Sequence, residues 1–165
     1  MELPTFDART AFMNQIAALL PVANIVVDLD VATKPQFFAA IGDLFERRAG
    51  IPHAGVSASL AAREKLGSTG LGQGVAIPHG RIHGLRDALG AFARLRAPIA
   101  FDAPDGKPVG QLFVLLVPEQ ATDRHLQLLS ELAQMFSERA FRDRLNTAAD
   151  ADALSGVFRA WEPAG

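Results

Sequence analysis

Apolar residues recur along this chain at two spacings: every three or four positions in some segments, and at alternate or consecutive positions in others. The first pattern predicts helices and the second predicts strands. The first predicted helix covers residues 8–20, which Asp7 caps and Pro21 closes. Its apolar face comprises Phe12, Ile16, Leu19 and Leu20.

The next segment predicts a strand followed by two helices. Residues 23–29 form a short run that is rich in β-branched side chains, as is typical of a strand. Thr33-Lys-Pro-Gln36 is a capping box with proline in the first turn, and the helix that it opens is predicted to end near Gly50. A shorter helix is predicted over residues 57–66, with Arg63 in its last turn or two.

The middle of the chain is rich in predicted strands. Residues 74–77 are predicted to form a short strand, residues 88–96 carry small or apolar side chains at alternate positions, and residues 111–117 are a continuous apolar run, as in a strand covered on both faces. Between the last two runs, residues 101–108 are rich in turn formers and predict a reversal of the chain. We therefore expect an antiparallel pair within a mixed parallel and antiparallel sheet.

Helices are predicted again after the last strand. Thr122 or Asp123 caps a helix whose apolar stripe is Leu126, Leu129, Leu132, Ala133 and Phe136. Further helices are predicted over residues 138–145 and, after the capping box 147–150, over residues 148–160. The pattern as a whole predicts an α/β fold, a mixed sheet with helices on both faces.

Length and composition narrow the class of protein. The 165 residues are expected to form one domain, 1–165, that buries roughly two-thirds of its unfolded surface. With 49% hydrophobic residues, 21% charged residues and a net charge of −2, the chain does not favour nucleic acid as a partner. It lacks cysteine, a long apolar run and a signal peptide, so we expect a cytoplasmic protein without disulfides or a membrane span.

One histidine stands in an unusual setting. A glycine-rich stretch, residues 67–74, leads into a short apolar strand that stops at Pro78. Proline has no N–H to give to strand pairing, and Gly80 is predicted to let the backbone turn away at once. We therefore expect His79 at a strand end rather than inside a core, where its imidazole is free to act as a nucleophile or proton carrier near neutral pH.

Two further residues are candidates for the same chemistry. His125 falls in the first turn of its predicted helix, one position before the apolar stripe, so it is predicted to point beside the core. A helix N-terminus favours a bound anion and disfavours protonation of a nearby imidazole. Arg63 is either a solvated arginine or a fork of donors for phosphate oxygens.

Other kinds of site are disfavoured by context. The glycine run lacks the Gly-Lys-Ser/Thr ending of a P-loop and leads into a strand, so a nucleotide cradle is not expected. His79 and His83 have the spacing of a helical zinc pair, but Pro78 and the nearby glycines oppose a helix there. No Gly-x-Ser-x-Gly motif marks a serine hydrolase. His53 is interpreted as a surface residue in a loop.

These residues resemble the type 2 enzyme IIA domains of the bacterial phosphoenolpyruvate phosphotransferase system, the fructose and mannitol type. The closest likeness is to the nitrogen-regulatory branch, enzyme IIA-Ntr. The resemblance rests on residues 63–81, 97–102 and 115–118 and on His125-Leu, and it extends more weakly over about residues 24–158. It implies the mannitol/fructose-type enzyme IIA fold, with the site at strand ends beside the glycine-rich loop.

The resemblance also implies a role for each candidate residue. His79 is the expected phosphoryl acceptor, through Nε2, from a phosphohistidine on a small carrier protein of the HPr/NPr type. Its Nδ1–H is then expected to be held by a backbone carbonyl or similar acceptor. Arg63 and His125 match the family's supporting arginine and second histidine, and no metal or cofactor is implied. Arg81 departs from the family, because nitrogen-branch relatives commonly have lysine there.

The resemblance leads to three hypotheses for function. The first is a regulatory phosphocarrier, rather than a stand-alone enzyme, whose phosphorylation state is sensed by targets such as potassium transport or sensor kinase components. The second is a sugar-specific enzyme IIA subunit that passes its phosphoryl group to a separate IIB protein. The third is a binding module that is not phosphorylated, which leaves the set of His79, Arg63 and His125 unexplained. Neither IIB and IIC segments nor membrane helices are evident, so this chain is not expected to import sugar alone.

Overall fold

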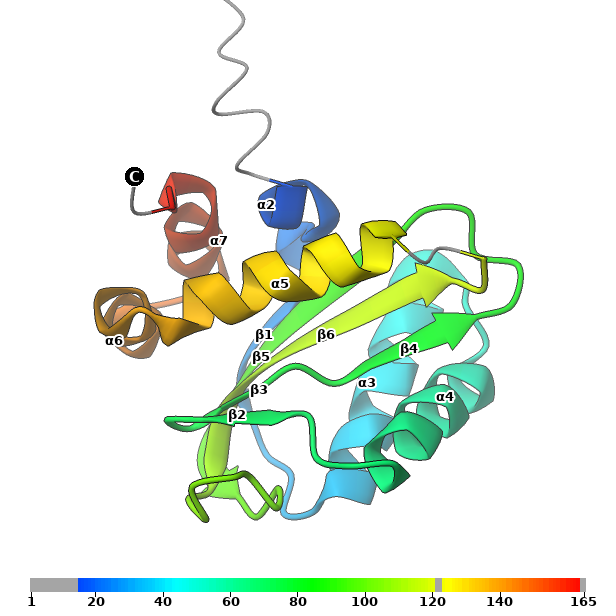
Figure 1. Ribbon diagram of the computed structural model, residues 1–165, viewed down its shortest axis with the longest axis horizontal. Coiled ribbons are helices and arrows are strands. Elements are labelled where there is room, and N and C mark those ends of the chain that lie inside the picture. The colour runs from blue at the N-terminus through cyan, green and yellow to red at the C-terminus, as the bar shows by residue number, and fades with distance from the viewer. Residues whose placement is uncertain (1–14, 121–122, 164–165) are drawn as a thin grey trace, which may run out of the picture.

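A mixed six-stranded sheet forms the centre of the molecule, with helices on both faces (Figure 1). The computed structural model describes residues 15–120 and 123–163. In chain order the elements are α2 (Gln15–Leu19), η1 (Val22–Asn24), β1 (Ile25–Leu29), α3 (Lys34–Ala49), α4 (His53–Lys65), β2 (Gly70–Gly72), β3 (Val75–Ala76), β4 (His79–Ile82), β5 (Leu89–Ile99), β6 (Val109–Pro118), α5 (Asp123–Ser137), α6 (Arg139–Thr147) and α7 (Ala151–Ala160).

The pairing of the strands confirms the predicted mixed sheet. The order is β1-β5-β6-β3-β2, and β4 also pairs with β6. Strands β5 and β6 are antiparallel and are joined by the reversal predicted at residues 101–108. Strand β1 runs parallel to β5, while β3 and β4 both run parallel to β6.

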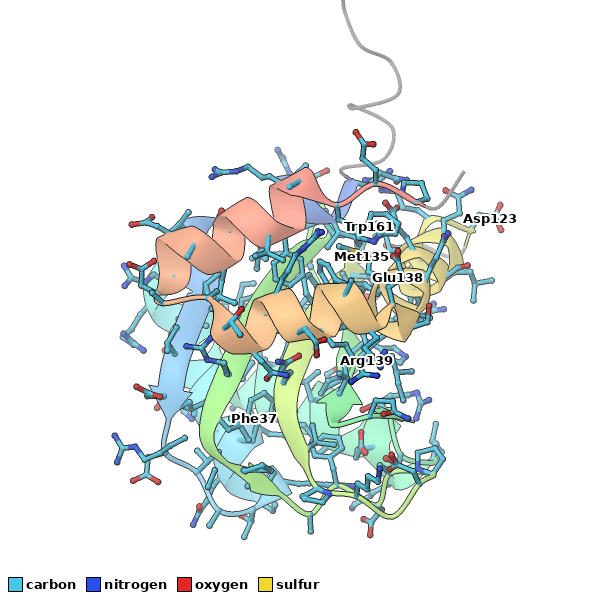
Figure 2. All side chains as sticks on the ribbon, turned by 90° about the vertical axis from the view of Figure 1, so that its left-hand side faces the viewer. Phe37, Asp123, Met135, Glu138, Arg139 and Trp161 are labelled. Atoms are coloured by element: carbon cyan, nitrogen blue, oxygen red, sulfur yellow. The ribbon has the colours of Figure 1, made fainter. Side chains whose placement is uncertain are left out.

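Strand β6 is buried on both faces, as its continuous apolar run predicts. Its side chains alternate between two core clusters. Phe113, Leu115 and Val117 pack on the side of α5, α6 and α7, whereas Leu112, Val114 and Leu116 pack on the side of α3 and α4. In Figure 2 the labelled Phe37 comes from α3, and Met135 lies near Glu138 and Trp161 where α5 gives way to α6.

Most of the predicted helices are present, with some changes at their ends. Helix α3 has the predicted cap, since the Thr33 Oγ1 accepts a hydrogen bond from the Gln36 backbone N–H at 3.2 Å. The capping box predicted at 147–150 is wrong: Thr147 ends α6, and Asp150 caps α7, which begins at Ala151, by accepting from the Ala153 N–H at 2.9 Å. The helix predicted over residues 57–66 begins earlier, at His53, because the Pro52 carbonyl already accepts the first hydrogen bonds of a helix. His53 is therefore exposed, as predicted, but it lies in a helix and not in a loop.

Parts of the two remaining helix predictions lie outside the described residues. Of the helix predicted over residues 8–20, the structure describes α2, in which Ile16 and Leu19 are buried. Asp7 and Phe12 lie outside the described residues, as does the alternative cap Thr122. Among the residues that the structure does describe, no helix is long and apolar enough to cross a membrane.

The prediction that the chain turns away at Gly80 is wrong. His79 is the first residue of β4, and the strand continues through Gly80 to Ile82. Strands β3 and β4 keep a single register along β6, with Ala76 opposite Leu112 and His79 opposite Leu115. Pro78 gives no N–H, but its carbonyl still accepts from the Leu115 N–H at 3.0 Å. The proline thus interrupts the strand without ending its alignment on β6.

Gly80 is needed for close packing and not for a turn. A Cβ at this position would lie 2.2 Å from the Ser59 Oγ and 3.3 Å from the Ser59 backbone carbon. Ser59 belongs to α4 and its hydroxyl donates to the Arg81 carbonyl at 3.0 Å. The strand that carries His79 therefore lies directly against α4 because residue 80 has no side chain.

Gly80→Ala is expected to destabilise the protein by about 1–3 kcal/mol, because the added methyl group forces β4 away from α4. Gly156→Ala is the matched control: a Cβ at Gly156, within α7, meets nothing within 4 Å. That substitution should be neutral or stabilise by about 0.5–1 kcal/mol. Urea unfolding of both variants measures the difference, and equal stability of the two would contradict the packing account.

Candidate functional site

His79 is held in one orientation by the backbone that precedes it. Its Nδ1 lies 2.8 Å from the Ile77 carbonyl oxygen. A carbonyl oxygen only accepts hydrogen bonds, so in the neutral imidazole Nδ1 carries the proton and Nε2 keeps its lone pair. This is the contact that the family resemblance leads one to expect.

His125 lies in the first turn of α5, and its ring packs against that of His79. The two rings have centroids 5.4 Å apart and lie at 69° to each other. Within the described part of the chain, the Nε2 of His125 is buried and has no hydrogen-bond partner. Two imidazoles that are far apart in sequence thus form one cluster.

The predicted apolar stripe of α5 is correct in part: Leu132 and Phe136 are buried, and Leu129 packs against the core. Leu126, the first residue of the predicted stripe, is 66% exposed, and Ala133 is exposed as well. Leu128 and Met135, which the prediction omitted, complete the buried face. His125 is half-buried, one turn before the buried Leu128.

Arg63 lies in the last turn of α4, as predicted. One guanidinium nitrogen, Nη1, donates to the Gly67 carbonyl at 2.8 Å. The other N–H groups of Arg63 have no hydrogen-bond partner within the described residues and are available to a ligand, and the charge is close enough to His79 to affect its protonation. The guanidinium group therefore binds the glycine-rich loop through one nitrogen, and its other N–H groups can donate to an anion.

Both imidazoles of the cluster favour the neutral form. Burial lowers the pKa of His79, and the charge of Arg63 lowers it further, whereas the Ile77 carbonyl and the charge of Glu64 act in the opposite direction. Burial also lowers the pKa of His125, with His79 and Arg81 adding to the effect. At neutral pH the His79 Nε2 is therefore unprotonated and able to attack an electrophile.

The other histidines lie apart from this cluster. His83 has a side chain that is 91% exposed and lies 2.9 Å from the Glu119 carboxylate, which raises its pKa. His53 lies 3.1 Å from Glu46 through its Nδ1. Arg81, the position where the resemblance showed a departure, donates to the Glu119 carbonyl at 2.7 Å.

Glu64 and Thr69 were not among the residues singled out from the sequence. Both are buried, and the Thr69 hydroxyl donates to the Glu64 carboxylate at 2.7 Å. In the sequence these two residues look ordinary. Charged residues are common at the exposed end of a helix, and threonine is common in the turn that follows one. Their place inside the motif 63–81 was the available signal.

Comparison with known proteins identifies the family. The family described as "Phosphoenolpyruvate-dependent sugar phosphotransferase system, EIIA 2" matches residues 18–160. The chain belongs to this EIIA 2 family. The match includes His79, Arg63 and His125.

Similar members of the EIIA 2 family are nitrogen regulatory proteins. The nitrogen regulatory protein of Pseudomonas aeruginosa is 42% identical over 145 residues, which cover 86% of this chain and 93% of the relative. The crystal structure of nitrogen regulatory protein IIA-Ntr from Neisseria meningitidis has 52% identity and a TM-score of 0.82, and the match covers 87% of this chain and 98% of that one. The predicted likeness to the nitrogen-regulatory branch is thus confirmed.

The same fold also occurs outside the nitrogen-regulatory branch. The structure of IIA mannitol from Escherichia coli matches with a TM-score of 0.69 at 19% identity, over 84% of this chain and 97% of that chain. A likeness at this identity shows the fold alone. It confirms the predicted mannitol-type EIIA architecture.

Arg63→Met is expected to raise the pKa of His79, because it removes a positive charge that disfavours the imidazolium. Arg81→Met is the matched control, since the Arg81 charge lowers the pKa of His125. It should therefore raise the midpoint of His125 and leave that of His79 nearly unchanged. NMR titration of both imidazoles measures these midpoints, and an unchanged or lower His79 midpoint in Arg63→Met would show the prediction to be wrong.

Proposed function

We propose that this chain is a cytoplasmic regulatory phosphocarrier of the nitrogen-type phosphotransferase system, built as a single domain. In this proposal His79 accepts a phosphoryl group from a phosphohistidine on a carrier protein of the HPr/NPr type. The observation that carries it is the 2.8 Å contact between the His79 Nδ1 and the Ile77 carbonyl, which leaves Nε2 unprotonated. The membership of the EIIA 2 family and the likeness to nitrogen regulatory proteins support the same proposal.

Phosphoryl transfer to His79 needs only the groups of this site and the phosphohistidine of the carrier. The lone pair of the His79 Nε2 forms a bond to phosphorus while the bond from phosphorus to the carrier's histidine nitrogen breaks, and that nitrogen keeps the electron pair. The proton on the His79 Nδ1 stays on that nitrogen, hydrogen-bonded to the Ile77 carbonyl, so the acceptor needs no separate base. Because phosphoryl transfer passes through a loose transition state, the protein's part is to position the two imidazoles and to stabilise charge.

Arg63, His125 and the first turn of α5 would stabilise that charge. Arg63 offers the guanidinium donors that Gly67 does not occupy. His125 has a buried, unpartnered Nε2 within the described residues, which becomes a donor to phosphate if its proton is on that nitrogen. The N-terminal N–H groups of α5 add the positive end of a helix dipole.

Phosphorylation would also be the signal. A phosphoryl group adds nearly two negative charges to a surface that otherwise presents neutral imidazoles, and this is sufficient to form or break an interface. Regulatory targets, of the potassium transport or sensor kinase kind that the resemblance implies, would then distinguish the two states. The sugar-specific alternative predicts a different carrier and a IIB protein as recipient.

His79→Ala is expected to abolish phosphoryl uptake, because it removes the acceptor atom. His125→Ala and Arg63→Ala should slow uptake about a hundredfold, the typical effect of losing one donor to developing charge. Intact-mass spectrometry after incubation with phosphoenolpyruvate, enzyme I and a carrier protein measures all three. His53→Ala, an exposed histidine in α4, is the control and should behave as wild type.

The choice of carrier separates the two phosphotransfer hypotheses. Faster uptake from the nitrogen-branch carrier supports the regulatory assignment, and faster uptake from the sugar-branch carrier would replace it with the transport subunit. Full uptake by His79→Ala would contradict the acceptor assignment itself.

The uptake rate is expected to remain above half of its neutral-pH value at pH 6.5, the ordinary pKa of histidine, and to reach half only at lower pH. The reason is that burial and Arg63 lower the pKa of His79, so the reactive neutral form persists in more acidic solution. Initial rates over a pH series, with the carrier supplied already phosphorylated, measure this. A rate that has already halved at pH 6.5 would contradict it.

A further inference from the structure

We propose that Glu64 and Thr69 are positioning residues for His79, which they orient through the backbone of the glycine-rich loop and of Ile77. The inference rests on the proposed function of His79 as acceptor. It concerns residues that act through other groups and do not touch the phosphoryl group themselves.

The Glu64 carboxylate anchors the loop that follows α4. Its side chain is only 6% exposed. It accepts hydrogen bonds from the Thr69 hydroxyl at 2.7 Å and from the Thr69 N–H at 3.1 Å, and the Lys34 ammonium lies 3.0 Å away. A buried carboxylate is tolerated only when it is paired and hydrogen-bonded in this way, so Thr69 has little freedom to move.

Two backbone hydrogen bonds carry this restraint from Thr69 to His79. The Thr69 carbonyl accepts from the Ile77 N–H at 3.0 Å, which joins the loop to the segment before β4. The Ile77 carbonyl then accepts from the His79 Nδ1–H at 2.8 Å. The residue that selects the tautomer of His79 is therefore itself held by Thr69, and Thr69 is held by Glu64.

The same loop is tied by Arg63. The Arg63 Nη1 donates to the Gly67 carbonyl at 2.8 Å, so consecutive residues of α4 hold the loop at two points. Arg63 and Glu64 also have opposite effects on the imidazole, since the Arg63 charge lowers the pKa of His79 and the Glu64 charge raises it. The end of α4 thus sets both the orientation and the electrostatics of the acceptor.

The first test compares Thr69→Val with Thr69→Ser. Valine has the shape of threonine without its hydroxyl, whereas serine keeps the donor to Glu64. We expect Thr69→Val to reduce phosphoryl uptake about tenfold or more, as small displacements of reacting groups do. Its ¹⁵N spectrum should show the Nε2–H tautomer of His79 alongside the Nδ1–H form. Thr69→Ser should keep the wild-type tautomer and rate.

The second test compares Glu64→Gln with Asp102→Asn. Both residues contact the Lys34 ammonium, but the exposed Asp102, unlike Glu64, makes no hydrogen bond to Thr69 within the described residues. Asparagine also suits the positive φ of 54° at residue 102. Glu64→Gln should slow uptake about tenfold or more and lower the NMR midpoint of His79, with Arg63 and His125 still present. Asp102→Asn should change neither.

The outcomes separate this proposal from the proposed function. If Thr69→Val and Glu64→Gln fold, as amide spectra will show, and keep the wild-type tautomer and rate, the positioning proposal is overturned. It is also overturned if their rates fall with the tautomer unchanged, or if Thr69→Ser behaves like Thr69→Val. If wild type takes up no phosphoryl group, the proposed function fails, while the tautomer of His79 in the variants still decides whether Glu64 and Thr69 orient it.

Discussion

The site depends on the pairing of one short segment, residues 75–82, with β6. Because β6 is buried on both faces, its position is set by two cores at once, and a strand aligned on it has little freedom to slide. Strands β3 and β4 keep one register on β6 across Pro78, which places His79 opposite Leu115. The alternation of strand side chains then puts His79 on the face of α5 and Gly80 on the face of α4.

The helices complete the site from opposite ends. Helix α5 brings His125 against His79, whereas the last turn of α4 brings the charge of Arg63 close enough to lower the pKa of His79. Both imidazoles are partly shielded from water, which favours their neutral forms at the pH where a nucleophile is needed. The arginine that favours an anion also opposes protonation of the acceptor, so one charge serves both purposes.

Similarity of fold and similarity of sequence support different conclusions about this protein. The mannitol IIA structure shares the architecture at 19% identity, whereas the nitrogen regulatory relatives share 42% and 52% identity over most of both chains. An architecture can host several functions, so the functional conclusion rests on the residues around His79 and on the closer relatives.

Local patterns in the sequence were sufficient for much of the fold. The capping box at Thr33, the reversal at residues 101–108 and the buried strand at 111–117 depend on neighbouring residues, and the structure contains all of them. The glycine-rich stretch and the proline that precede His79, and the family resemblance, could also be recognised from the sequence. Only the tertiary structure decided the pairing of β4 beyond Pro78, the face of α5 that carries His125, and the link from Glu64 through Thr69 to Ile77. The physical reason is that strand register, helix rotation and the partners of a buried carboxylate are set by contacts between residues far apart in the chain, and no local spacing encodes them.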